Sequence, residues 1–421
     1  MKRFLRQNIV ILVLLNSGNL FNYLFQLVVG RTMSPADFGG FNALNSTMVI
    51  FSAPLAIVPL VMARFTARFA LSDMGRVRAL LTRALVLAAG LAAGAYGLGA
   101  LCLPFLQSFL HIEEASPILL MLGVMAGSFI LPVPWGMLQG LQRFTGYGIA
   151  GASNALFRLL GSLAFVVGLA WGVNGALLSS LTGIVAALAV NCIFLRDVFP
   201  LPKSPLPTGL LKEVGAYSVG MLLSSVIVMI LGNLDLVLVR HYCDAEGAGL
   251  YATAAILGRI AFYLPSVLMS VLFTEAATAK EAGRNDLSSL WMSMGMTAAL
   301  GGGFALFCLL ASKLVVGLLF GASYAAAGPL LSVISGAMAL LAVANILFVY
   351  FQARSEFGFV WFQVAGVGLF LGLVTIYHDT PMTVAWLLFA GIAVMLAGSL
   401  GWLLARVRRG RDDAPRPARA A

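Results

Sequence analysis

Two arginines, Arg158 and Arg259, lie inside long apolar stretches of the sequence, where a charged side chain is unusual. At the centre of a membrane helix a charge costs roughly 2.5–3.5 kcal/mol on insertion scales, so such residues usually face the protein interior and take part in function. Asn154 lies four residues before Arg158, and Tyr263 lies four residues after Arg259, so each arginine has a polar neighbour on its helix face. The pattern predicts a cationic cavity for an anionic ligand. The alternative is that backbone carbonyls and neighbouring amides satisfy each guanidinium.

Acidic groups are scarce at the depth predicted for these arginines. With a rise of 1.5 Å per residue, both are expected about 14–15 Å into their helices, near the middle of the bilayer. Asp235 falls in the outer part of the seventh expected helix, and no carboxylate is expected beside either arginine. We therefore predict that neither has an acidic partner at its own depth.

Further polar side chains share one face of the first apolar segment, and others lie near the start of the second. They are Asn16, Asn19, Tyr23 and Gln26 in the first segment, and Asn42 and Asn45 in the second. Hydrogen bonds between membrane helices contribute about 0.6 kcal/mol each, and such bonds would account for these residues. The same residues would equally suit the lining of a hydrophilic path, so both interpretations stay open.

The apolar stretches that carry these residues are long enough to cross a membrane. Of 421 residues, 61% are hydrophobic and 10% are charged, whereas a soluble domain carries about 25% charged residues. Apolar runs of about 18 residues or more span the bilayer core and must be helical there, because lipid offers their backbone no hydrogen bonds. The sequence predicts an all-α polytopic membrane protein of about 12 transmembrane helices. They are expected near residues 8–30, 40–63, 84–110, 116–142, 148–170, 176–195, 213–240, 250–273, 290–311, 327–352, 358–376 and 383–405.

The basic residues predict the orientation of these helices. If the N-terminus is cytoplasmic, 21 of the 26 Lys and Arg residues fall on inner segments, only Arg31, Arg240 and Lys313 fall on outer ones, and Arg158 and Arg259 lie inside helices. Positively charged connections stay inside, so both termini are predicted to be cytoplasmic and the chain to lie in the inner membrane. The basic tail, residues 406–421, suits anionic lipid headgroups, and no nucleic acid is needed to explain the pI of about 9.8.

The two halves of the chain resemble each other. A proline-rich cytoplasmic linker, 196–212, separates a predicted six-helix lobe at 1–195 from a second at 213–405. Aligning the chain with itself at an offset of 240 − 31 = 209 residues superimposes several identical residues. These pairs are Leu27/Leu236, Val28/Val237, Arg31/Arg240, Ala36/Ala245, Gly40/Gly249 and Ala43/Ala252. An even number of helices keeps both copies in one orientation, so the lobes are predicted to be parallel repeats, with a site between them.

Motifs for enzymatic chemistry are absent from the sequence. There is no HExxH, no P-loop and no GxSxG in a strand–turn–helix context, so we expect neither an enzyme nor a bound cofactor or metal. The four cysteines form no CxxC pair. Cys102 and Cys243 fall toward the same predicted side, which allows a disulfide, although two thiols are the favoured interpretation.

Three segments carry a resemblance to a known family. They are NSGNLFNYLFQLVVGRTMSPADFGGFNAL at 16–44, QGLQRFTGYG at 139–148 and LGNLDLVLVR at 231–240. With the two six-helix halves, they resemble the oligosaccharide flippases of the multidrug/oligosaccharidyl-lipid/polysaccharide exporter (MOP) superfamily. The resemblance covers essentially the whole chain to Arg406, and its motifs are diffuse.

The resemblance implies a function for the predicted cavity. Members of this family flip polyprenyl-pyrophosphate-linked sugars from the inner to the outer leaflet by alternating access, for envelope polysaccharide biosynthesis. Arg158 and Arg259 would match the cationic cavities of such flippases. Some members couple to Na⁺ or H⁺ through an acidic residue in helix 7, which Asp235 matches in approximate place. Asp235 could instead pair with Arg240. Membrane lipids and polysaccharide assembly proteins are the expected partners.

Two other functions are compatible with the sequence. A multidrug or metabolite antiporter of the same superfamily would usually need carboxylates in its cavity, and the predicted midplane holds two positive charges and no negative one. A membrane component of a polysaccharide assembly machine that transports nothing would have a densely packed interior.

Overall fold

The structure is a computed structural model of the chain. It describes all residues except 1, 208, 266–267, 270–271, 273–275, 277–286, 355 and 413–421; for 2–16, 210–221, 225 and 408–412 it describes the helices but not the side chains.

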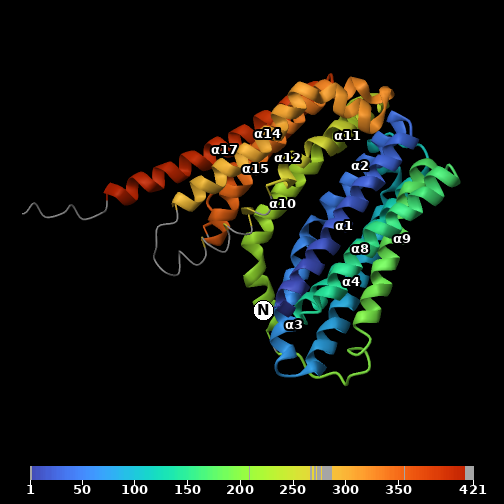
Figure 1. The fold of residues 1–421 in the computed structure, drawn as a ribbon, viewed down its shortest axis with the longest axis vertical. Helices are drawn as coiled ribbons and strands as arrows, with labels where there is room; N and C mark the ends of the chain where they lie inside the picture. The colour runs from blue at the N-terminus through green and yellow to red at the C-terminus, as the bar shows by residue number, and fades with distance from the viewer. Residues whose placement is uncertain are drawn as a thin grey trace, which may run out of the picture. The chain divides into compact units, whose positions relative to one another are not determined.

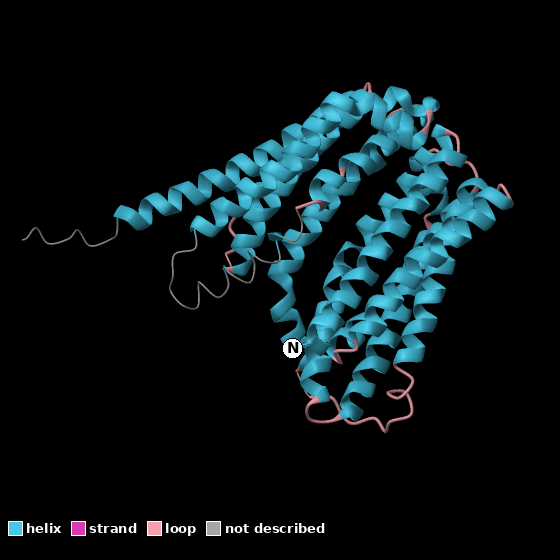
Figure 2. Ribbon diagram, viewed as in Figure 1, coloured by secondary structure: helices cyan, strands magenta, loops and turns pink. Residues whose placement is uncertain are grey.

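Every regular element in the described part of the chain is a helix (Figure 2). The first half contains α1 (Lys2–Thr32), α2 (Pro35–Ser52), η1 (Ala53–Ile57), α3 (Val58–Ala70), α4 (Met74–Leu101), α5 (Leu103–Leu110), α6 (Ala115–Ile130), α7 (Pro132–Gly140), α8 (Phe144–Ser162), η2 (Leu163–Gly168) and α9 (Gly172–Phe194). The second half contains α10 (Leu210–Tyr242), α11 (Ala245–Gly258), α12 (Ile260–Tyr263), α14 (Leu287–Phe320), η3 (Ala322–Ala327), α15 (Gly328–Ala353), α16 (Val360–Val374) and α17 (Pro381–Asp412). Each of the expected apolar segments overlaps one of these helices, so the all-helical fold class is confirmed.

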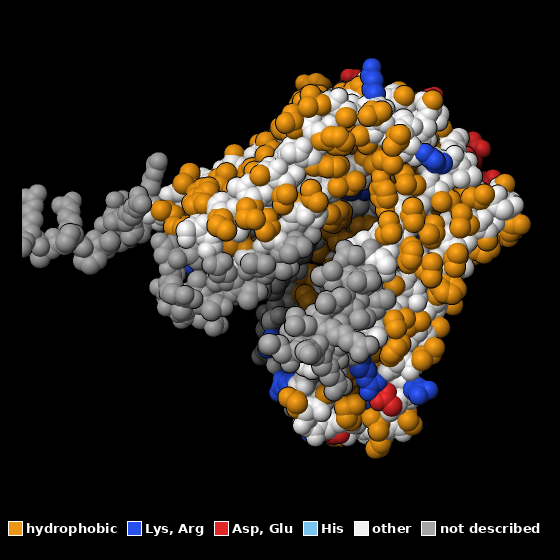
Figure 3. All heavy atoms as spheres, viewed as in Figure 1, with side chains coloured by type: hydrophobic (Ala, Val, Ile, Leu, Met, Phe, Trp, Pro, Cys, Tyr) orange, Lys and Arg blue, Asp and Glu red, His pale blue; other side chains and the backbone are white. Residues whose placement is uncertain are grey.

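The helices have the length and surface of membrane spans. Within the described residues, 9 helices are long and apolar enough to cross a membrane, and the shorter Val360–Val374 is apolar as well. On the face drawn in Figure 3, hydrophobic side chains cover the helices along their length, and charged ones gather near the helix ends. Lipid is the solvent that suits such a surface, because few polar groups are available to face water.

Prolines break several of the helices. The 3₁₀ turn η1, which holds Pro54, separates α2 from α3, and Pro132 begins α7 directly after α6. A proline lacks the N–H that would bond four residues back, so the helix bends or changes its winding there. In the second repeat the chain leaves the helix again at Pro265, which falls opposite η1 in the alignment, and a further break separates α11 from α12 at Arg259. The paired breaks are consistent with the internal repeat.

The chain forms two compact units, each described here by itself. Unit 1 comprises Met1–Leu222, Leu236–Thr253 and Gly317–Tyr324, and unit 2 comprises Leu223–Asp235, Ala254–Val316 and Ala325–Ala421. In unit 1, α1 packs on α8 and α8 packs on α9, as the neighbouring ribbons in Figure 1 show. In unit 2, α17 packs on both α15 and α16.

The first part of the proline-rich linker is attached to unit 1. The Ser204 amide donates to the Gly75 carbonyl over 3.3 Å, and Arg78 donates to the Leu201 carbonyl. Arg143 donates to the Asp197 carboxylate over 2.6 Å. The segment therefore follows the surface of unit 1 up to about Ser204 instead of forming a free spacer.

Candidate functional site

Arg158 lies on α8 and stacks on an aromatic ring of α1. Its guanidinium carbon is 4.0 Å from the centroid of the Phe25 ring, a cation–π contact. Gly183 on α9 makes the position of α8 feasible, because a Cβ there would lie 2.5 Å from the Asn154 carbonyl oxygen and 3.2 Å from the Arg158 Cβ. The close packing of α9 against α8 at Gly183, together with the Phe25 ring on α1, determines the position of this charge.

Two buried polar atoms on α8 and α1 lack a hydrogen-bond partner among the described residues. Nε of Arg158 is buried and has no hydrogen-bond partner among the described residues, and the same holds for Oε1 of Gln26, the residue after Phe25. Buried polar atoms in native proteins nearly always have such a partner. Among the described ion pairs, none includes Arg158. This part of unit 1 thus offers a positive charge and hydrogen-bonding capacity to a polar ligand.

Arg259 does have an acidic partner, and the prediction that it lacks one is wrong. Its Nη2 lies 3.5 Å from Oδ1 of Asp235, and the Asp235 side chain is fully buried. Asp235 therefore pairs with Arg259 and not with Arg240, which donates instead to two backbone carbonyls. The Arg259 charge is largely compensated inside unit 2.

The direction of a long side chain explains this error. The depths of Arg259 and Asp235 in the membrane were estimated from their positions along their helices, which locates only their Cα atoms. The side chain of a helical residue points back toward the N-terminus of its helix. Arg259 also occupies the break between α11 and α12, a position that the hydrophobic pattern does not reveal. The guanidinium is thereby brought to the level of Asp235 on α10.

The remaining predicted residues differ in their surroundings. Asn42 is buried and donates to the Phe38 carbonyl within its own helix over 2.9 Å. Asn45 and Asn154 are half-buried, whereas Asn19 and Tyr263 are exposed. The side chain of Asn16 lies outside the described residues. Phe25 was not predicted, because one aromatic residue in an apolar helix carries no distinguishing signal.

The two arginines belong to different units, so their convergence on one cavity stays a prediction. Within the described residues no cluster of His, Cys, Asp and Glu suits a metal ion. Cys102 and Cys243 are thiols, and no disulfide joins them.

In the described part of the chain the regular structure is helical and 9 helices are long and apolar enough to cross a membrane, so the protein is a multi-pass membrane protein. The family described as "Polysaccharide biosynthesis protein" matches residues 5–277, more than half of the chain. The protein belongs to this family. No curated protein matches it.

Solved structures share the fold of this chain. An inward-facing multidrug resistance MATE transporter of the MOP superfamily superimposes with a TM-score of 0.78 at 14% identity, covering 96% of this chain and 99% of that one. The lipid II flippase MurJ, in an inward closed conformation, gives 0.68 at 12% identity over 93% and 87%. A MOP superfamily transporter from Pyrococcus furiosus, described as having a binding pocket of reverse polarity, gives 0.64 at 14% identity over 96% and 94%. The chain therefore has the fold of MOP superfamily transporters.

Proposed function

We propose that this protein moves a polyprenyl-pyrophosphate-linked oligosaccharide from the inner to the outer leaflet of the cytoplasmic membrane by alternating access. The observation that supports this proposal is Arg158, a half-buried arginine whose buried Nε has no hydrogen-bond partner among the described residues and which forms none of the described ion pairs. A pyrophosphate is an anion that such a group binds well. Membership of the polysaccharide biosynthesis family agrees with a sugar-carrying substrate.

Each part of this substrate needs a different environment. The pyrophosphate needs cations, and a guanidinium binds phosphate oxygens through two parallel hydrogen bonds that are strengthened where water is excluded. The glycan needs a hydrated path, to which half-buried amides such as Gln26, Asn45 and Asn154 are suited. The polyprenyl chain can stay in lipid while the headgroup crosses.

Complementation of a flippase-deficient strain tests the role of Arg158. Arg158→Gln should lower flipping by about tenfold or more, because a hydrogen bond to a charged group contributes roughly 1.5–3 kcal/mol. Arg158→Lys should restore part of the activity, since lysine keeps the charge but lacks the planar fork. Arg406 is a matched control, because its guanidinium lies 4.4 Å from the Trp402 ring centroid at the end of a helix.

Arg406→Gln should flip substrate like the unmodified protein, with protein levels measured in parallel. Undiminished flipping by Arg158→Gln would contradict the proposed anion site. Extrusion of cationic dyes by the unmodified protein, without flipping, would favour a multidrug antiporter. Polysaccharide assembly that needs the protein while flipping proceeds without it would favour an assembly component.

A further inference from the structure

Two arginines of the internal repeat cap helices of the opposite repeat. Arg31, in the last turn of α1, donates from Nε to the Leu319 carbonyl over 2.7 Å and from Nη2 to the Leu318 carbonyl over 2.5 Å. Both carbonyls lie in the last turn of α14, a helix of the second half. The last carbonyls of a helix have no partner within it, and a cation there interacts favourably with the helix dipole.

Arg240, at the matching position of the second half, makes the same contact in reverse. It lies in the last turn of α10 and donates from Nε to the Leu110 carbonyl over 2.9 Å and from Nη2 to the His111 carbonyl over 3.0 Å. These carbonyls end α5, in the first half. Leu110 and Leu319 differ by the same 209 residues as Arg31 and Arg240, so both Nε atoms bind repeat-equivalent carbonyls. We call these two contacts the arginine clasp.

Aromatic groups surround each contact of the arginine clasp. The ring centroid of Phe38 lies 5.8 Å from that of Phe320 and 6.0 Å from that of Tyr324, whose hydroxyl donates to the Met33 carbonyl over 3.2 Å. Beside the other contact, the His241 ring stacks on Phe109 with centroids 4.1 Å apart. The Arg240 hydrogen bonds are buried or part-buried, which strengthens them, whereas the Arg31 hydrogen bonds are exposed.

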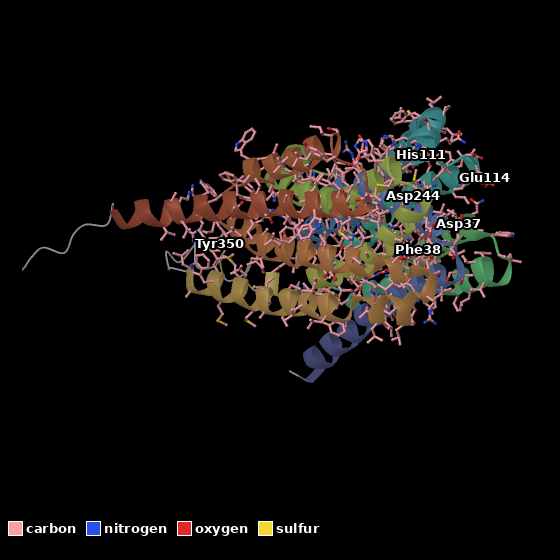
Figure 4. All side chains as sticks on the ribbon, turned by 90° about the horizontal axis from the view of Figure 1, so that it is seen from above. Asp37, Phe38, His111, Glu114, Asp244 and Tyr350 are labelled. Carbon is pink, nitrogen blue, oxygen red and sulfur yellow. The ribbon has the colours of Figure 1, made fainter. Side chains whose placement is uncertain are left out.

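The helices that follow the two arginines, α2 and α11, pack closely against each other through glycines. A Cβ on Gly39 of α2 would lie 2.6 Å from the amide nitrogen of Gly249 on α11, so only glycine fits. Gly40, the residue after Gly39, is the repeat equivalent of Gly249, so the crossing involves matching stretches of the two repeats. His111, Asp37 and Asp244 lie at this same end of unit 1 (Figure 4). The distribution of basic residues predicts that this end faces the outside.

We infer that the arginine clasp is the outer gate of the transport cycle: both contacts hold the outer ends of the two repeats together, and both must break for the outer side to open. This inference rests on the proposed alternating-access function. In the closed gate, each arginine of one repeat donates hydrogen bonds to the last carbonyls of a helix in the other repeat. Four hydrogen bonds from charged donors close the gate, and none of the described ion pairs includes either arginine, so opening the gate separates no described ion pair.

The accessibility of a buried position further along α2, the helix that follows Arg31, tests the inference directly. Leu44 on α2 is fully buried. Leu44→Cys, in a background without the four native cysteines, is treated with a membrane-impermeant maleimide on intact cells. The double variant Arg31→Gln with Arg240→Gln should raise the labelling rate of this cysteine by about tenfold or more. Losing the charge-assisted hydrogen bonds favours the open state, and a change of about 1.4 kcal/mol in the closed–open equilibrium corresponds to a factor of ten. Arg31→Lys with Arg240→Lys should label at an intermediate rate.

Arg143 provides the matched control. It also donates to the last carbonyl of a helix, Phe194 of α9, but at the other end of unit 1 and within one repeat. Arg143→Gln should leave labelling of Leu44→Cys unchanged. A double glutamine variant that elutes and melts like the parent, yet labels at the parent's rate, would overturn the inference. If the glutamine variants do not fold, the double lysine variant is tested in their place, and a labelling rate equal to the parent's would again overturn the inference. Labelling of the cysteine tests only the gate, whereas flipping by the unmodified protein tests the proposed function. Either claim can therefore be contradicted while the other stands.

Discussion

Arg259 and Asp235 neutralise each other inside unit 2, with Nη2 of the arginine 3.5 Å from Oδ1 of the aspartate. One charge comes from the break between α11 and α12 and the other from the interior of α10. A buried pair of this kind contributes little net stability, but removing one partner leaves the other charge uncompensated at a cost of about 3–5 kcal/mol.

Neutralising the two partners should therefore be strongly non-additive. Asp235→Asn and Arg259→Gln should each lower the unfolding temperature in detergent, and the double variant should melt closer to the unmodified protein than either single variant. The measurement is thermal unfolding of purified protein followed by size-exclusion chromatography. Additive losses in the double variant would show that the two charges act independently.

The coupling role proposed for Asp235 has a separate test. If the carboxylate binds Na⁺ or H⁺ in exchange for Arg259, flipping by Asp235→Asn should lose its dependence on the corresponding gradient. Flipping is measured in vesicles with and without Na⁺ and proton gradients. A dependence that matches that of the unmodified protein would leave Asp235 with a structural role only.

The predicted orientation can be measured at exposed or half-exposed positions. Ala115 begins α6 and Ala245 begins α11, at the end that is expected to face outside. A single cysteine at either position, in the cysteine-free background, should react with the impermeant maleimide on intact cells. A cysteine at Ser288, near the start of α14, should react only after the cells are opened. The reverse pattern would invert the topology.

Acid should loosen the docked part of the linker. Two hydrogen bonds from Arg143 hold the pKa of Asp197 below its ordinary value of 3.8. A carboxyl with a lowered pKa stabilises the folded form above its ordinary pKa and loses that contribution as the pH falls through the lowered value. The pair is partly exposed, so its contribution is modest, about 0–1 kcal/mol.

Limited proteolysis of inside-out vesicles checks this effect. Cleavage between Asp197 and Leu206 should be faster in Asp197→Asn than in the unmodified protein at neutral pH. An acid-stable protease should show the two rates converging only as the pH falls below 3.8 and through the lowered pKa of Asp197, where the native carboxyl becomes protonated. Equal cleavage rates at neutral pH would mean that the other contacts hold the linker by themselves.

The helices were predictable from the sequence because lipid leaves an apolar run only one stable backbone conformation. Breaks at Pro54 and Pro132 follow from the missing proline N–H. The Asp235–Arg259 pair was not predictable, since it depends on a side-chain direction and on a helix break at Arg259 that no residue type announces. The repeat alignment matched Arg31 with Arg240 but could not name their acceptors, because every residue carries a carbonyl.

The reciprocity of the arginine clasp has a consequence for the origin of the chain. Two identical six-helix polypeptides related by a twofold axis would form the same hydrogen bonds twice. The arginine of each polypeptide would donate to the helix-terminal carbonyls of the other, as in an isologous homodimer. A fusion of two such genes would encode a single chain that already contains this interface. The copies could then diverge wherever the interface does not constrain them. Arg158 and Arg259, whose alignment partners are Val367 and Ile50, are differences of this kind.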